Sequence, residues 1–377
     1  MIKIRNTGFV LLLTLLCCRK PYTPPASSTS QSYLVVEGVI DSGNDSTFIK
    51  LSKTVKLTQG TTNPLLGAVV TVEGNQGGTY PLLDVNSTGI YKAAPLGLSA
   101  SQKYRLRIVT GSKQYVSDFI APEPTPPIDS IGYTTKDTLV TLYINTHDPL
   151  NATHYYRWDY GETWIFHSKY PSEYVLDTTT HSIVLRTPAQ QVYTCFGNDT
   201  SSNILLTSTA ALSKDIVYQS PLTQIPFSSE KFTQKYSILV KQYALTSAAY
   251  EFYVNMKTST EQLGSIFDAE PTQLNGNIHN VADATEPVIG YMTVTNVQSK
   301  RIFLTNAVVP KSQVVQYPYA CEQDATGGFN STETVLIDPP LTDIPTLAIG
   351  GGNYLYSTPQ CVDCTLRGTT QTPPFWK

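Results

Sequence analysis

Residues 33–52, YLVVEGVIDSGNDSTFIKLS, decide the fold class of this chain. The stretch opens with Tyr33–Ile40, which is rich in valine and other residue types that favour strands. A cluster of Asp, Ser, Gly and Asn follows, as is typical of a turn. Phe48–Ser52 then alternates apolar and polar residues, as a strand with one face in water does. The stretch therefore predicts two strands joined by a turn, and a fold that is mainly β.

The same succession of strands and turns continues to residue 121. Five further runs have strand character: Ala68–Glu73, Thr79–Leu83, Gly89–Lys92, Tyr104–Thr110 and Gln114–Phe119. About seven short strands separated by turns predict a β-sandwich over residues 33–121. The pattern resembles an immunoglobulin-like or carboxypeptidase-regulatory-like module.

A proline-rich segment, residues 122–127, follows this predicted domain. Proline fixes φ and has no amide donor, so the segment cannot lie inside a sheet and is predicted to be a linker. Residues 128–377 are predicted to form a larger β-rich domain with one main helix. Four residues within 247–257 recur at helical spacing: Ala249, Phe252, Tyr253 and Met256. Such an apolar stripe is expected to pack a helix against a sheet.

The N-terminal residues predict export from the cytoplasm. Lys3 and Arg5 precede a short apolar run, and Cys17 and Cys18 end it. A basic start and a short apolar middle are typical of a signal peptide, here residues 1–17. The run is too short to span a membrane, which needs about 20 apolar residues. The pattern resembles a bacterial lipoprotein signal, and an ordinary cleaved signal is the alternative.

Cys18 is the residue that we expect to carry lipid. A cut before Cys17 would place the bulkier Leu16 at the cleavage point, so Cys18 is preferred. Each buried methylene contributes about 0.8 kcal/mol, so several acyl chains such as palmitate would hold the protein firmly on a membrane. Residues 18–32 are rich in Pro, Ser and Thr and are predicted to be a flexible tether.

Four cysteines lie beyond the predicted anchor: Cys195, Cys321, Cys361 and Cys364. An exported chain meets an oxidising compartment, so this even number predicts structural disulfides, and three pairings are possible. The spacing of Cys361 and Cys364 would also suit zinc or a redox pair. A zinc site would need a second closely spaced pair, which Cys195 and Cys321 do not form. We therefore expect disulfides, with no metal and no cofactor.

The composition and the motifs point away from enzymes and nucleic-acid binding. The formal charge is -3 with 15% charged residues and no basic stripe, so no nucleic-acid partner is expected. No nucleophile elbow and no zinc-protease helix occur in the sequence. Gly350–Asn353 lacks the lysine of a phosphate-binding loop and is interpreted as a turn. The protein is predicted not to be an enzyme; an unrecognised hydrolase is the weakest alternative.

An aromatic-rich run at 155–160, followed by Trp164, is a candidate binding surface. Strand alternation places Tyr156, Trp158 and Tyr160 on one face and Tyr155, Arg157 and Asp159 on the other. Trp, Tyr and Arg often anchor interfaces. The candidate binding residues are therefore Tyr155, Arg157 and Trp164. The alternative, which we favour for the run as a whole, is core packing, because large aromatic residues dominate burial.

Several stretches carry a family resemblance. They are YLVVEG at 33–38, IDSI at 128–131, YYRW at 155–158, YSILVKQYALT at 236–246 and CVDCTLRG at 361–368. With the lipoprotein signal, they make the chain similar to the Bacteroidota lipoproteins catalogued as domain of unknown function 4249. The resemblance assigns no chemistry.

The resemblance implies a lipid-anchored protein of the outer membrane, on either its periplasmic or its cell-surface face. It also implies a partner, a TonB-dependent nutrient transporter. The predicted function is therefore that of a non-catalytic accessory protein, and its ligand is not indicated. The alternative is a stand-alone glycan- or peptide-binding surface protein.

Overall fold

The computed structural model describes residues 32–55, 63–177, 179–180, 182–261, 276–317, 319–324 and 343–376. The chain is mainly β, with one long helix among these residues, and this confirms the predicted fold class. Cys18, the predicted signal peptide and the predicted tether up to residue 31 lie outside the described residues. No helix in the described ranges is long and apolar enough to cross a membrane.

The N-terminal body is one 11-stranded sheet around an apolar core. Its first eight strands are β1 (Leu34–Asp41), β2 (Thr47–Lys53), β3 (Asn63–Pro64), β4 (Val69–Gly74), β5 (Thr79–Asp84), β6 (Ile90–Ala93), β7 (Tyr104–Thr110) and β8 (Lys113–Ser117). All seven strands predicted in this part of the sequence form. The sheet order β18-β8-β7-β4-β5-β6-β2-β1-β19 curls until its two ends approach each other, so the sheet nearly closes.

Three short strands from much later in the chain complete the N-terminal body. They are β18 (Ile278–Asn280), β19 (Val288–Ile289) and β20 (Val294–Thr295). β18 pairs antiparallel with β8, whereas β19 and β20 pair parallel with β1. Parallel pairing needs a long crossover connection, and here the crossover contains most of the second body. Gly290, at φ +142°, permits this pairing, because a Cβ there would lie 2.2 Å from the carbonyl oxygen of Val36.

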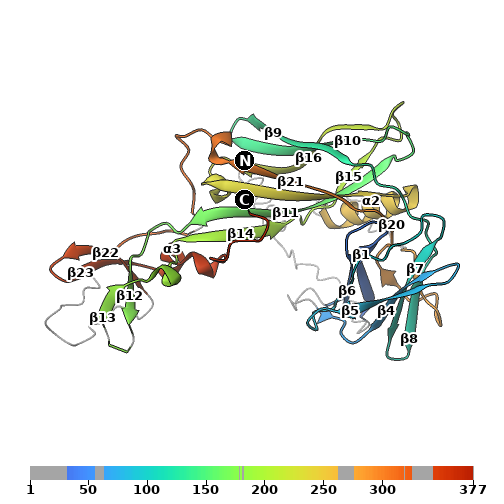
Figure 1. Ribbon diagram of the computed structural model, residues 1–377, viewed down its shortest axis with the longest axis horizontal. Helices are drawn as coiled ribbons and strands as arrows, with labels where there is room; N and C mark the ends of the chain where they lie inside the picture. The colour runs from blue at the N-terminus through green and yellow to red at the C-terminus, as the bar shows by residue number, and fades with distance from the viewer. Residues whose placement is uncertain are drawn as a thin grey trace, which may run out of the picture.

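The second body, the sandwich body, packs two antiparallel sheets face to face (Figure 1). One sheet has the order β16 (Ile216–Pro226), β10 (Leu139–His147) and β9 (Ile128–Lys136). The other has the order β14 (Thr194–Thr200), β11 (Tyr155–His167), β17 (Lys235–Ala244) and β21 (Gln298–Thr305), and β15 (Leu205–Ser208) also pairs with β11. Tyr156 and Trp158 are buried between the two sheets, as the alternation predicts.

Helix α2 (Ser247–Glu261) covers the other face of the five-stranded sheet, as the apolar stripe predicts. Its buried residues are Ala249, Phe252 and Tyr253, and Tyr155 of β11 packs against them. The backbone N–H of Ala249 donates to the hydroxyl of Thr246, so Thr246 caps the start of the helix. The helix lies at the end of the sandwich body that faces the N-terminal body (Figure 1).

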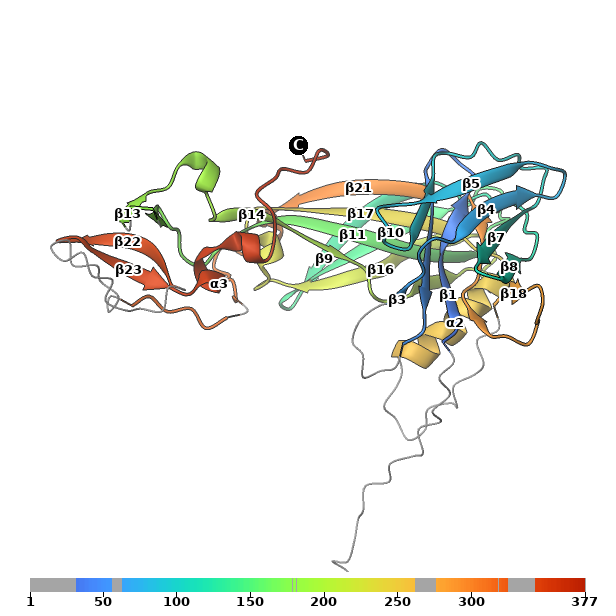
Figure 2. The same ribbon diagram turned by 90° about the horizontal axis from the view of Figure 1, so that it is seen from below.

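A distal lobe extends from the opposite end of the sandwich body (Figures 1 and 2). It contains the hairpin β12 (Tyr174–Asp177) and β13 (Ser182–Leu185), the hairpin β22 (Ile344–Gly350) and β23 (Asn353–Ser357), and α3 (Pro359–Val362). Gly350–Asn353 forms the turn of the second hairpin, as predicted, and its three glycines adopt positive φ. The described single-turn helices are η3 (Pro188–Gln190), η4 (Glu230–Phe232), η5 (Asn306–Val308) and η6 (Cys364–Leu366).

Candidate functional site

Two disulfides form, as predicted, and the structure resolves the pairing that the sequence left open. Cys195 pairs with Cys364, and Cys321 pairs with Cys361. The two cysteines of the CVDC stretch therefore have different partners. Because every sulfur of the four is bonded to another, these residues form neither the zinc ligand pair nor the dithiol pair that were the alternatives.

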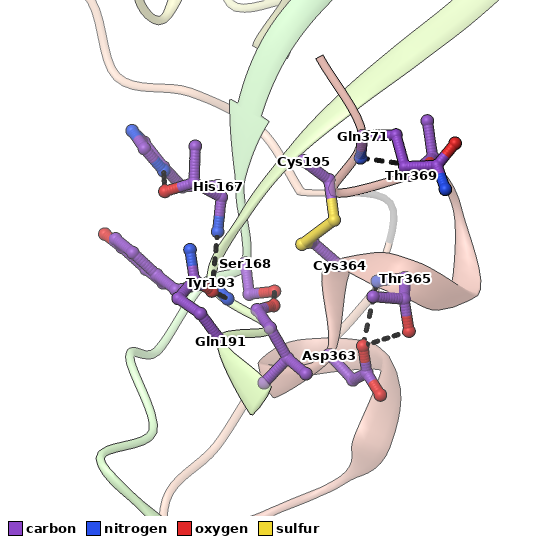
Figure 3. Close-up of a disulfide and its surroundings, with 12 residues drawn as sticks. His167, Ser168, Gln191, Tyr193, Cys195, Asp363, Cys364, Thr365, Thr369 and Gln371 are labelled. Atoms are coloured by element: carbon purple, nitrogen blue, oxygen red, sulfur yellow. Dashed lines mark hydrogen bonds between the residues drawn. A yellow bond between two sulfur atoms is a disulfide. The ribbon is translucent and has the colours of Figure 1, made fainter. Parts of the chain in front are cut away.

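The Cys195–Cys364 bridge fastens the distal lobe to the sandwich body (Figure 3). Cys195 lies on β14 and is fully buried, and Cys364 begins η6. The carboxylate of Asp363 caps this short helix by accepting the backbone N–H of Thr365 at 2.8 Å. Beyond it, Thr369 and Phe196 exchange backbone hydrogen bonds of 2.8 and 3.0 Å. The C-terminal residues thus continue along the edge of the five-stranded sheet.

The distal lobe exposes apolar side chains on both hairpins. We call four of these residues the apolar lobe surface: Val184, Leu185, Leu347 and Ile349. Leu185 is 66% exposed and Leu347 is 54% exposed. Exposed apolar residues of this kind are typical of protein interaction sites.

A cavity of about 280 Å³ lies where the N-terminal body meets the sandwich body. Its walls come from β1, β11, β19, helix α2 and the loop before β15. Eight apolar or aromatic residues line it: Val35, Val36, Ile204, Phe252, Tyr253, Met256, Ile289 and Tyr291. We call it the interdomain cavity. Ligand sites often have this form, an apolar hollow at a domain interface with a few polar groups.

Arg157 supplies the positive charge of the interdomain cavity. Its guanidinium lies 4.4 Å from the ring centre of Tyr243 and 4.9 Å from that of Tyr253, within the range of cation–π contacts. Burial disfavours the charge, but Tyr253, Asp159 and Tyr243 favour it, and the pKa of Arg157 is raised. The carboxylate of Asp159, 3.3 Å from Nη2, is its ion partner. Arg157 is therefore a charged group inside a largely apolar wall.

The other two candidate binding residues lie elsewhere. Tyr155 stands on the same face of β11 as Arg157, and its ring contacts that of Tyr250 at 4.9 Å. Trp164 lies on the opposite face and is 9% exposed. Its ring covers Gly197, where a Cβ would come within 2.6 Å of it. The structure thus brings Tyr155 and Arg157 together under α2 and places Trp164 in the core of the sandwich body.

Buried carboxylates in the sandwich body are held by side-chain partners. Glu162 is 3% exposed; it accepts a hydrogen bond from Tyr236 and forms a 2.5 Å ion pair with Lys231. Burial and the neighbouring Glu162 carboxylate raise the pKa of Tyr236. Asp215 accepts hydrogen bonds from Tyr156 and from Thr209. Among the described residues, no group of three or more His, Cys, Asp or Glu is placed to hold a metal ion.

A second hollow of about 390 Å³ lies on the outer face of the five-stranded sheet. Gly161 forms part of its floor, and a Cβ there would have open space around it. Polar groups of Asn198, Asp199 and Thr200 line one side. On the other side, the guanidinium of Arg301 stacks 3.6 Å from the ring centre of Phe375. We call it the polar groove.

These observations define a class: a disulfide-linked, mainly β protein of two bodies and a projecting lobe. The sequence also identifies the family. The profile described as "Domain of unknown function (DUF4249)" matches residues 19–301, and the chain belongs to this family. No curated protein sequence matches the chain.

Similarity to solved structures is weak. A crystal structure of a Salmonella alpha-2-macroglobulin mutant has a TM-score of 0.18 and 9% identity, covering 58% of this chain and 14% of that chain. A candidate carbohydrate binding protein from Bacteroides uniformis has a TM-score of 0.14 and 11% identity, covering 57% of this chain and 90% of that chain. At these TM-scores, neither similarity carries an argument about function.

Proposed function

We propose that the protein is a non-catalytic outer-membrane lipoprotein that acts as the accessory partner of a TonB-dependent nutrient transporter. Lipid on Cys18 would hold it to the membrane. The two disulfides support an exported location, because such bonds persist in oxidising compartments. The distal lobe is the observation that carries the proposal of a protein partner.

The distal lobe has the properties of a docking element. It projects from the sandwich body at the end away from the N-terminal body, to which a lipid tether would connect (Figure 2). Its exposed leucines would bury apolar area against a partner. The Cys321–Cys361 bridge fixes the segments beside the hairpins before any partner arrives, which lowers the entropy cost of docking. A lipid-anchored protein can thus reach a neighbour in the same membrane.

The partner is tested by mild crosslinking in the native host, detergent solubilisation, affinity purification of the tagged full chain and mass spectrometry. We expect a TonB-dependent transporter among the crosslinked proteins. The double variant Leu185→Ser/Leu347→Ser should lower its recovery by about tenfold or more, since a loss of 1.4 kcal/mol is a factor of ten. Leu83→Ser is the matched control, because Leu83 is 74% exposed on the N-terminal body. Equal recovery by all three proteins, or no transporter at all, would contradict the proposal.

The anchor is tested separately by metabolic labelling with palmitate. The wild-type chain and Cys17→Ala should be labelled and sediment with membranes. Cys18→Ala should be unlabelled, because the thiol that accepts the lipid is gone. A labelled Cys18→Ala protein would show that lipid is attached elsewhere.

The polar groove supports a second candidate function, a stand-alone glycan-binding surface protein. Hydroxyl, amide and carboxylate groups beside an aromatic ring are the groups that bind sugars, and the groove offers them in Asn198, Asp199, Thr200 and Phe375. A glycan array with the full chain tests it. Glycan binding that is lost in Asn198→Ala would support this function. The lack of binding to any glycan on the array would count against it.

A further inference from the structure

Arg157 differs from the other partly buried arginines of the chain. Arg105 and Arg367 donate hydrogen bonds of 2.8 and 2.7 Å to the carboxylates of Glu73 and Glu230. Arg157 donates no hydrogen bond to a described residue. Its Nε is buried without a partner, as is that of Arg367, but Arg157 lacks the carboxylate hydrogen bond that Arg367 makes. The side chain is 16% exposed. A guanidinium carries five N–H donors, so a cation in this position has unused binding capacity.

Two aromatic rings lie beside this cation. The guanidinium carbon is 4.4 Å from the ring centre of Tyr243 and 4.9 Å from that of Tyr253. A ring face offers no oxygen to accept a hydrogen bond, so the guanidinium N–H groups remain available to a ligand. The carboxylate is the group that matches a guanidinium, because its two oxygens accept two parallel N–H donors.

The negative groups near the cavity do not oppose such a ligand. Asp159 is already paired with Arg157, and its side chain is 42% exposed, so solvent shares its charge. Glu37 lies 2.7 Å from the ammonium of Lys50. The remaining walls include Phe252, Met256 and Ile289, which suit an apolar ligand body.

We propose that the interdomain cavity binds a small molecule with an apolar body and one carboxylate, which Arg157 holds. The cavity volume of about 280 Å³ limits the ligand to a small molecule. This inference goes beyond the proposed function, because it needs neither a transporter nor a lipid anchor.

Isothermal titration of the detergent-solubilised full chain tests the proposal with four carboxylates: benzoate, phenylacetate, indole-3-acetate and hexanoate. The binding of each carboxylate is compared with that of the corresponding neutral amide. We expect at least one carboxylate to bind at least tenfold more tightly than its amide. Arg157→Met should weaken that binding by tenfold or more. Met256→Trp should abolish it by filling the cavity.

Arg301→Met is the matched control, because Arg301 belongs to the same five-stranded sheet and also stacks on an aromatic ring, but it lines the polar groove. It should bind the carboxylate like the wild-type chain. Arg157→Lys keeps the charge but loses the planar arrangement of N–H donors, so it should bind the carboxylate with intermediate affinity. Binding by this variant would also show that the fold tolerates substitution at position 157. Failure of all four carboxylates to bind in the millimolar range would overturn the proposal. Equal binding of acid and amide, or undiminished binding by Arg157→Met, would do so as well.

Discussion

The N-terminal body buries mostly valine, leucine and isoleucine, whereas the sandwich body buries large aromatic residues such as Trp158 and Phe166 beside a disulfide. Their buried acids differ too. Asp41 of the N-terminal body accepts backbone N–H groups of Gly43 and Val297. Glu162 of the sandwich body depends on side chains. Side-chain partners can be removed by substitution and backbone partners cannot, so the two bodies should respond differently to mutation.

The largest effect is expected from removing the bridge between the sandwich body and the distal lobe. The double variant Cys195→Ala/Cys364→Ala opens a loop of 169 residues, which the chain-entropy model values at about 5 kcal/mol. The sandwich body and the lobe should lose protection against amide hydrogen exchange. The buried strand β7 of the N-terminal body should keep its protection, because no disulfide among the described residues reaches it. An equal loss of hydrogen-exchange protection in both bodies would contradict this prediction.

A smaller effect is expected from Lys231→Met. This change leaves the nearly buried carboxylate of Glu162 without its cation, at a cost of about 3 kcal/mol in the free energy of unfolding. The matched change in the N-terminal body is Lys113→Met. The ammonium of Lys113 lies 2.8 Å from the carboxylate of Glu286, and the Lys113 side chain is 54% exposed. That pair should contribute no more than about 1 kcal/mol. Denaturant unfolding of both variants measures the difference, and similar losses would contradict it.

The smallest effect concerns His147 at the end of β10. The hydrogen bond and the charge of Asp129, 2.7 Å from Nδ1, raise the pKa of His147. The protonated pair therefore stabilises the folded state fully below the ordinary histidine pKa of about 6.5, and this contribution is lost as the pH rises through the raised value. Because the pair is half exposed, we expect less than about 1 kcal/mol.

His147→Gln tests this contribution through urea midpoints measured between pH 5.5 and 8.5. The urea midpoint of the wild-type protein should fall as the pH rises over this range, and the midpoint of the variant should fall by less. Asp129→Asn removes the same pair and should behave alike. A decline of the same size in all three proteins would assign the pH dependence to other groups.

Much of the fold could be predicted from the sequence because strand alternation and turn residues are local signals. They placed all seven strands of 33–121, the helix at Ser247–Glu261 and the inward faces of Tyr156 and Trp158. Strand character is visible at Val288–Val297, but the sequence does not show that the late strands join the first sheet, because that pairing depends on the tertiary structure. The disulfide pairing depends on the tertiary structure, and so a cysteine count could not select it.

The candidate site was predictable only in part, for the same reason. Arg157 stood out as a charge within an aromatic run. Its neighbours Tyr243 and Tyr253 come from β17 and α2, and only packing brings them to the guanidinium. The helical spacing assigned Tyr253 to packing alone. The lobe hairpins had no signal beyond the turn at Gly350–Asn353.

The late return of residues 278–295 to the first sheet has a consequence for biosynthesis. The sandwich strands β9 to β17 are an insertion between two parts of a single sheet. A nascent chain that has delivered only its first 127 residues still has the edges of β1 and β8 unpaired. The N-terminal body is therefore completed only by residues translated well after its first strands, and until then its unpaired strand edges are open to pairing with other chains.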